Sequence, residues 1–322
     1  MKKCLFLMLM MVSMSVMGQN DYFVTTREQD EQVNEVEPQI TEEKQFIMDN
    51  FKYINVTDWK RGMRFMVVDD DSLGAFLRDK SLNGRLITDF YHQIVAVDTV
   101  EVYVKDQSKN WAETYVAFNT MDGDVLEFKC SGVRGEFQKD KLNAYIRGLI
   151  YLDEIDVAKR LLVGKTLYTL TNKALVDTPD GERFKKVPKF SPFKVIEVGV
   201  GDMYHGPLKM ICTGQDGKKV AFYVILSGTN NDFGDGIGNG FFYNAFSFTN
   251  PRTKYKNIGI ADWNLIKEGK VRIGMNQNAC RLSWGEPRKI NRTTGSYGVH
   301  EQWVYYNSYL YFENGKLTAI QN

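Results

Sequence analysis

Apolar and aromatic residues beyond about Ile47 come in short runs that are separated by polar, turn-forming sequences. Short runs of this kind are typical of β-strands, and an Asp-Gly pair between two of them is a strong hairpin signal. In the first part of the chain the runs are Arg64–Val68, Gln93–Val97, Val100–Val104, Thr114–Phe118 and Val125–Cys130, the last two joined across Asp122-Gly123. The pattern predicts a mainly β protein built from small modules.

The strand pattern occurs twice. Gly164–Tyr168 is similar to Gly62–Met66, displaced by 102 residues, and Lys194–Val198 is similar to Gln93–Val97, displaced by 101. Met210–Phe222 is similar to Ala117–Phe128 with a displacement of about 94, and each stretch carries an Asp-Gly pair. Three similarities in one order and with nearly constant displacement indicate a duplicated module.

Each copy holds about five strands in roughly 70 to 80 residues, and antiparallel strands in that number commonly close into a small barrel. In size and strand spacing, residues 58–228 resemble tandem Src-homology-3-like (SH3-like) barrels. We therefore expect a first β-barrel module at residues 47–136. A second module, which includes a glycine-rich loop, is expected at residues 163–250.

The segment between the copies has a helical pattern. It contains no proline and carries apolar residues at helical spacing, at Leu142, Tyr145, Ile146, Leu149, Ile150, Leu152, Ile155, Ala158 and Leu161. Gly164 can end such a helix. The pattern predicts a connecting helix over residues 137–162 that docks the two barrels together.

Residues 258–322 have a different pattern. A short helix at Trp263–Val271 closed by Gly269, and a second from about Asn276 to Trp284, are followed by Gly285-Glu286-Pro287, which can end a helix. A loop then leads to a strand at Glu301–Tyr306 and to a hairpin at Leu310–Ile320 with Asn-Gly at its turn. We expect Trp303 and Phe312 to be buried on one face of the sheet.

This order of motifs resembles the BamE/SmpA (OmlA) family of outer-membrane assembly lipoproteins. The matching elements are Gly274-Met275, Gly285-Glu286-Pro287, Trp303-Val304-Tyr305 and the hairpin Leu310–Ile320, about 50 of the 322 residues. The resemblance implies an α+β domain, two helices packed on a three-stranded sheet, that acts through protein or envelope-surface contacts without catalysis. The family's lipidation cysteine is missing and two extra modules precede the domain, so its role in assembly is not carried over.

The N-terminal part predicts export. Lys2 and Lys3 precede the apolar stretch Leu5–Val16, and the small residues Val16 and Gly18 predict a signal peptide at residues 1–18 that is cleaved before Gln19. Cys4 precedes the apolar stretch, so lipidation is not expected. Residues 19–46 are polar and acidic, which predicts a disordered linker. We expect a periplasmic or outer-envelope protein with no transmembrane segment after cleavage.

Charge and cysteine content exclude several classes of function. The chain has 41 basic and 40 acidic residues, and a nucleic-acid-binding protein would need a concentrated basic patch. After cleavage three cysteines remain without a C-x-x-C motif, so we expect each in a separate core, with no metal site and no cofactor. The loop Asn230–Gly240 lacks the glutamate that completes an EF-hand, and we interpret it as solvated.

The candidate chemistry favours binding over catalysis. The only histidines are His92, His205 and His300, and no Gly-x-Ser-x-Gly motif occurs. We predict a non-catalytic binding or scaffolding protein of the envelope whose partner is an envelope protein or a surface glycan. The candidate contact residues are Tyr297, His300 and Trp111. The alternative is a cell-wall or glycan hydrolase, cysteine- or carboxylate-based, that carries SH3-like targeting modules; one candidate pair for it is Cys280 with His300.

Overall fold

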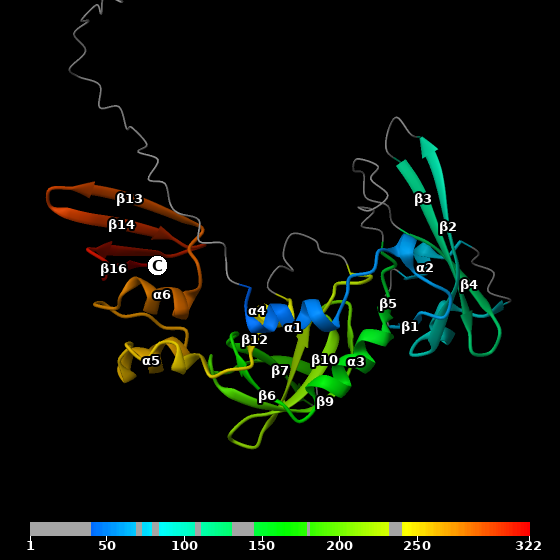
Figure 1. Ribbon diagram of the computed structural model, residues 1–322, viewed down its shortest axis with the longest axis horizontal. Helices are drawn as coiled ribbons and strands as arrows, with labels where there is room; N and C mark the ends of the chain where they lie inside the picture. Colours follow the sequence, from blue (N-terminus) through cyan, green and yellow to red (C-terminus); the bar gives the residue numbers. More distant parts are fainter. Residues whose placement is uncertain are drawn as a thin grey trace, which may run out of the picture. The chain divides into compact units, whose positions relative to one another are not determined.

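The computed structural model describes residues 40–68, 73–78, 84–106, 111–130, 145–178, 181–231 and 240–322 (Figure 1). The protein is mainly β, with 42% strand and 23% helix, and its sheets include a half-barrel. The predicted signal peptide, residues 19–39 of the predicted linker and residues 232–239 of the glycine-rich loop lie outside the described residues. In the part that is described, every helix is too short or too polar to cross a bilayer.

The first module is a five-stranded antiparallel sheet in the order β4-β3-β2-β1-β5. Its strands are β1 (Arg64–Val67), β2 (Ile94–Asp106), β3 (Trp111–Thr120), β4 (Val125–Lys129) and β5 (Leu149–Tyr151), with short helical turns at Val56–Asp58, Leu73–Phe76 (α2) and Ile87–Phe90. The inward side chains of alternate strand positions, among them Phe65, Phe118 and Phe128, are fully buried in one core. The predicted alternation of apolar residues is therefore what builds this core.

The predicted helix over residues 137–162 is wrong at residues 145–151. Residues 137–144 are not described, Leu149–Tyr151 is strand β5, and the helix α3 begins at Leu152 and ends at Leu162 (Figure 1). β5 pairs with β1, with Tyr151 opposite Phe65 and Leu149 opposite Val67. The apolar spacing of this segment fits a helix as well as a buried strand, and the pairing with a strand about 85 residues earlier decides between them.

The second module is a seven-stranded sheet in the order β12-β6-β9-β10-β11-β7-β8. Its elements are β6 (Thr166–Thr169), β7 (Lys173–Thr178), β8 (Gly181–Lys186), β9 (Pro192–Asp202), β10 (Gly206–Thr213), β11 (Lys219–Val224), α4 (Phe242–Ala245) and β12 (Phe246–Ser247). One face packs on a core that contains Leu167, Met210 and Phe222, and α3 contributes Ala158 and Leu162 to the same core. The β7–β8 hairpin extends this sheet beyond the strands that the first module has.

The two modules share strand order and register. The order β1-β2-β3-β4 in the first sheet corresponds to β6-β9-β10-β11 in the second. Both sheets have a bulge in the corresponding strand pair, between Val97 and Thr99 in one and between Val195 and Glu197 in the other. The duplicated strand pattern is thus present in the structure, whereas the SH3-like arrangement of the modules stays a prediction.

The hydrogen bonds show a different displacement for the second sequence similarity, the one between Gln93–Val97 and Lys194–Val198. Gly62 donates its backbone N–H to Val97 O at 2.8 Å, and Gly164 donates to Val195 O at 2.9 Å, so Val97 corresponds to Val195. The displacement in this strand is therefore 98 residues and not 101. A run of alternating apolar residues can be aligned in several ways, and only the hydrogen bonds determine the register.

The predicted disordered linker over residues 19–46 is wrong at its C-terminal end, because residues 42–46 are helical. Helix α1 begins at Glu42 and ends at Asn50, and the Thr41 side chain caps it by accepting a hydrogen bond from Lys44 N. The buried Glu43 carboxylate accepts hydrogen bonds from Ser247 Oγ and Phe248 N, both at 2.8 Å. Residues about 200 positions later in the chain therefore stabilise the start of α1, a segment whose composition had indicated a linker.

The C-terminal domain has four strands where three were expected. Its elements are α5 (Ile260–Lys267), α6 (Gln277–Trp284), β13 (Lys289–Gly295), β14 (Gly298–Val304), β15 (Tyr309–Glu313) and β16 (Lys316–Gln321), with the strands in sequential order. The predicted loop before Glu301 is β13, an edge strand whose residues are all exposed. Because neither face of β13 is buried, it carries no alternating apolar pattern that could predict it.

The predicted core positions of this domain are confirmed. Trp303 is 0% exposed and Phe312 is 1% exposed, and their ring centroids lie 4.4 Å apart. The three cysteines are also placed as predicted, because Cys130, Cys212 and Cys280 are free thiols in three separate cores. Burial raises the pKa of each thiol to about 12.

Lys189 of the second module closes the end of α6. Its ammonium donates hydrogen bonds to Ser283 O at 2.8 Å and to Leu282 O at 3.3 Å, and burial lowers the pKa of Lys189. Lys189→Met would leave these carbonyls without their donor, so we expect it to lower the free energy of unfolding by about 1–3 kcal/mol. Chemical denaturation measures this loss, and the exposed Lys194→Met should stay within about 0.5 kcal/mol of the wild type. Equal stabilities of the two variants would contradict the assignment.

Candidate functional site

The structure brings together two of the three predicted contact residues. Tyr297 lies in the turn of the β13–β14 hairpin and is 67% exposed, and its ring centroid is 5.2 Å from that of His300 on β14. Trp111 begins β3 in the first module, opposite Asp106, and only its backbone belongs to the described structure. Tyr297 and His300 therefore form one local surface, and Trp111 belongs to a different sheet.

His300 lies on the outer face of the C-terminal sheet, beside a shallow pocket of about 380 Å³. A chain of hydrogen bonds crosses all four strands there, from Asn291 to Gln302 (2.9 Å), from Gln302 to Tyr311 (3.1 Å) and from Tyr311 to Gln321 (2.7 Å). These cross-strand pairs stabilise the sheet by side-chain contact, as is usual on a solvated face. Their uncharged amide and hydroxyl groups offer a polar surface but no nucleophile.

The structure does not assemble the pair Cys280 with His300 that the hydrolase alternative requires. Cys280 is 0% exposed in the core between α6 and the sheet, on the side of Trp303. Alternate residues of a strand point to opposite faces, so His300 points away from the face that Trp303 occupies. The thiol and the imidazole are therefore on opposite sides of β14.

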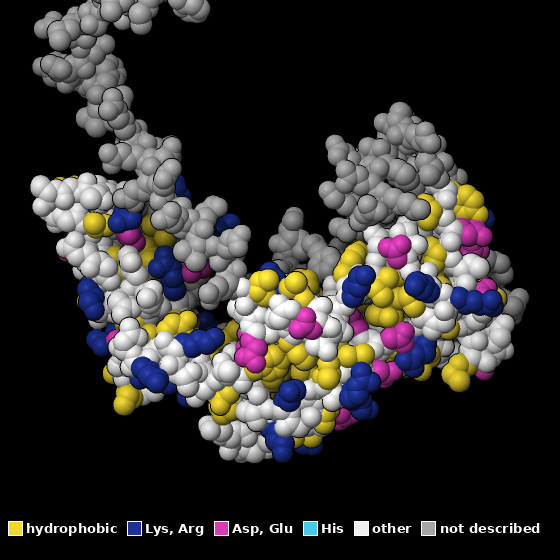
Figure 2. All heavy atoms as spheres, viewed as in Figure 1, with side chains coloured by type: hydrophobic (Ala, Val, Ile, Leu, Met, Phe, Trp, Pro, Cys, Tyr) yellow, Lys and Arg dark blue, Asp and Glu magenta, His cyan; other side chains and the backbone are white. Residues whose placement is uncertain are grey.

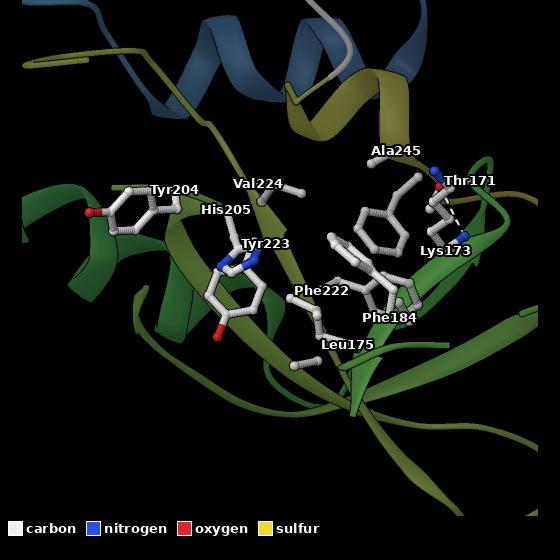
Figure 3. Close-up of a pocket in the computed structure, with 13 residues that line it drawn as sticks. Thr171, Lys173, Leu175, Phe184, Tyr204, His205, Phe222, Tyr223, Val224 and Ala245 are labelled. Atoms are coloured by element: carbon white, nitrogen blue, oxygen red, sulfur yellow. Dashed lines mark hydrogen bonds between the residues drawn. The ribbon is translucent and has the colours of Figure 1, made fainter. Parts of the chain in front are cut away.

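A more enclosed site, which we name the aromatic groove, lies in the second module (Figure 3). It has a volume of about 270 Å³. Tyr204 lies at one end, Thr171 and Lys173 lie at the other, and His205 and Tyr223 are adjacent between them (Figure 3). The residues that line it are Thr171, Lys173, Ala174, Leu175, Phe184, Tyr204, His205, Ala221, Phe222, Tyr223, Val224, Ala245 and Phe246.

The groove forms where β7 diverges from β11. These two strands pair at a single position, Leu175 opposite Ala221. At the other end of β11, Ile225 bonds instead to the segment before α4, donating its N–H to Gly240 O at 2.9 Å. Core side chains are reached through the opening between these two contacts, which is why buried Phe222 and Phe246 line the groove.

The β9–β10 turn positions the histidine of the groove. The Asp202 carboxylate accepts hydrogen bonds from the backbone N–H groups of Tyr204 (2.7 Å) and His205 (2.6 Å). Its second oxygen lies 2.9 Å from His205 Nδ1, so a proton on Nδ1 donates to it and Nε2 stays directed away from Asp202. The His205 ring lies 5.2 Å from Tyr223 and 5.9 Å from Phe184. Three rings from three strand ends therefore meet at one side of the groove.

The charges beside the groove are mainly positive. Lys173 and Lys186 lie directly opposite each other on β7 and β8, on the same face as Phe184, and both are exposed. Lys209 Nζ lies 5.4 Å from the centre of the Tyr223 ring. Two carboxylates also lie in this region: Asp202 is hydrogen-bonded to His205, and Glu268 has a pKa that is lowered by Lys270 and also by Lys186.

Sequence reasoning missed the groove almost entirely. The sequence patterns single out His205 only as one of three histidines and do not single out Phe184 at all. The available signal was the position of Phe184, which stands between Arg183 and Lys185 and is 69% exposed. Single apolar side chains are common on protein surfaces, so this signal points to a site only together with the other rings of the groove.

The groove offers both apolar and hydrogen-bonding groups to a ligand. Rings and aliphatic side chains supply apolar contact, and His205, Thr171 and the tyrosine hydroxyls supply hydrogen bonds. Throughout the described residues, His, Cys, Asp and Glu side chains nowhere gather in a group of three that could hold a metal ion. The arrangement therefore favours stacking and apolar contact with an anionic or neutral ligand.

Comparisons of this chain with protein-family models, with curated proteins and with solved structures found no match.

Proposed function

We propose that this chain is a non-catalytic binding protein of the cell envelope and that the aromatic groove is its contact site. One observation carries the proposal: Phe184, opposite the buried Leu175, is 69% exposed, and its ring lies 5.9 Å from that of His205, which lies 5.2 Å from the ring of Tyr223. Aromatic residues in such positions supply much of the binding energy at protein surfaces. A groove with apolar walls and few polar groups is also the usual form of a binding site.

The cellular location is part of the same proposal. It rests on the leader-like sequence of residues 1–18, which predicts an exported, non-lipidated, periplasmic or outer-envelope protein. The resemblance of residues 258–322 to the BamE/SmpA family, and of residues 58–228 to SH3-like barrels, supports a protein that acts through contacts. The partner under this proposal is an envelope protein or a surface glycan.

The hydrolase alternative has less support. A cysteine nucleophile must be an accessible thiolate, whereas Cys130, Cys212 and Cys280 are buried and their pKa values are raised to about 12. The His205–Asp202 pair is oriented as in a general base, but the groove lining contributes neither a serine nor a cysteine next to it.

A photo-crosslinking amino acid placed at position 184 tests the proposal. We expect p-benzoylphenylalanine at this position to form an adduct with one partner in the native envelope, because the side chain stands at the mouth of the groove. The matched control is the same amino acid at Tyr306, which is 82% exposed in the C-terminal domain. Mass spectrometry of the adducts identifies whether the partner is protein or glycan.

The outcome distinguishes binding in the groove from random contact. An adduct at position 184 that is absent at position 306, and that disappears when Tyr223→Ser is added, supports the proposal. Equal labelling at both positions would show that exposure alone produces the adducts. A lack of any adduct at position 184 in envelope that contains the folded protein would contradict it.

A further inference from the structure

We infer that the occupant of the aromatic groove is an acidic segment of another protein that places a large apolar side chain against Phe184, over the buried Leu175 and Phe222. The inference rests on the proposed function and names its ligand class. It follows from the apolar lining of the groove and from Lys173, which also lines it.

The shape and lining of the groove fit an apolar side chain. Leu175, Phe222 and Phe246 line its inner part and are buried or nearly so, and Phe184 stands over them from β8. A volume of about 270 Å³ is of the size that one large side chain and its neighbours occupy. Recognition of a sugar requires several fixed donors and acceptors, and besides the tyrosines the lining supplies side-chain groups of this kind only at Thr171, Lys173 and His205.

Charge complementarity indicates acidic residues in the occupant. Like charges directly opposite on neighbouring strands destabilise a sheet, and Lys173 and Lys186 form such a pair. Among the described carboxylates, none lies within ion-pair distance of the Lys173 ammonium, which lines the groove. Glu268 lies near Lys186, because its pKa is lowered by Lys270 and also by Lys186, so the charge left for a carboxylate of the partner is that of Lys173.

His205 fits the same occupant. Its Nδ1 side is held by Asp202, so its Nε2 side can meet a backbone carbonyl or a carboxylate of a peptide. The ring also packs between Phe184 and Tyr223, which fixes its orientation before the ligand arrives. Preorganised aromatic contacts lower the entropic cost of binding.

Selection from a phage-displayed library of random peptides tests the inference, with the full mature chain immobilised at low ionic strength. We expect the enriched sequences to combine Phe, Trp or Leu with Asp or Glu a few residues away. Phe184→Ser should weaken a selected peptide at least about tenfold, as for a hot-spot residue. Lys173→Gln should weaken it about two- to fivefold at low salt, as for a rim charge, with a smaller effect at high salt.

The matched control is Lys194→Gln, an exposed lysine on β9 of the same sheet and outside the groove lining, which should leave the affinity unchanged. Circular dichroism of each variant verifies that it is folded. Enrichment of proline-rich or basic peptides would overturn the inference. So would acidic peptides whose affinity is the same for Phe184→Ser.

Two further outcomes separate this inference from the proposed function. If no peptide is enriched but the crosslinker at position 184 captures a glycan, the groove binds and the ligand class is wrong. If peptides are enriched only on a chain that begins at Ile40 and none on the mature chain, the acidic residues 19–39 compete for the groove, and the inference that another protein occupies it in the mature chain is overturned.

Discussion

Replacing Trp303 with alanine is expected to lower the free energy of unfolding of the C-terminal domain by about 3–5 kcal/mol. The side chain is completely buried against Phe312, and the Arg281 guanidinium lies 4.1 Å from the centre of its ring. Its indole N–H also donates a 2.7 Å hydrogen bond to Glu301 Oε2. The substitution therefore leaves a large cavity and removes a donor from a half-buried carboxylate.

Hydrogen exchange on peptides from β14 and β15 measures this loss locally, which matters because a chain with several modules need not unfold in one step. The matched control is Tyr306→Ala, because Tyr306 is 82% exposed in the same domain and should cost less than about 0.5 kcal/mol. A loss below about 1 kcal/mol for Trp303→Ala would show that Trp303 is not in the core and is instead a contact residue.

The second large effect concerns the pH dependence of stability, which we expect to be dominated by Glu154. This glutamate on α3 is buried and accepts a 2.6 Å hydrogen bond from Ser227 Oγ, and burial raises its pKa to about 7. Ser227 in turn contacts Thr229 Oγ1, which accepts the N–H of Ile54 from the first module. The carboxylate thus stands where α3, the loop after β11 and the first module meet.

The raised pKa of Glu154 determines whether stability rises or falls with pH. In the unfolded chain the pKa of Glu154 returns to about 4.5, so between about pH 4.5 and pH 7 the folded state binds more protons than the unfolded state. The free energy of unfolding should therefore fall as the pH rises through this window and level off on both sides. The difference between the two pKa values corresponds to about 3 kcal/mol.

Glu154→Gln isolates this contribution, because glutamine keeps the volume and can still accept the hydrogen bond from Ser227 but cannot ionise. Denaturation curves from pH 4 to pH 9 should show the variant more stable than the wild type above pH 7, by up to about 3 kcal/mol, with the advantage lost near pH 4. The control is Glu197→Gln on the exposed face of β9. Parallel pH curves for the wild type and Glu154→Gln would contradict the prediction.

The parts of the fold that were predicted correctly depend on local information. Trp303 and Phe312 are the large apolar residues of two short strands, and their burial on one face agrees with the two-residue period of a strand. The Asp-Gly pairs at residues 122–123 and 216–217 and the Asn-Gly pair at residues 314–315 mark turns where a glycine adopts positive φ, and all three glycines do so. Burial of the thiols follows from the general tendency of free cysteine to lie in the interior.

The parts that were missed depend on pairing over long distances in the chain. Leu149–Tyr151 becomes a strand because β1 offers it an edge, and Lys289–Gly295 becomes one because β14 does, although its own residues are all exposed. The helix α1 begins inside the predicted linker because Glu43 finds donors at Ser247 and Phe248. None of these partners can be read from the segment itself.

The sequence by itself determined the class of this protein: short alternating strands, a strand pattern that occurs twice, and a C-terminal domain with its core residues. Only the tertiary structure decided where a site forms. The aromatic groove joins Phe184, His205 and Tyr223 from β8, from the β9–β10 turn and from β11, and it exists because β7 pairs with β11 at one position and then diverges. The physical reason is that apolar periodicity acts over a few residues, whereas a groove depends on how far two strands separate after they have paired.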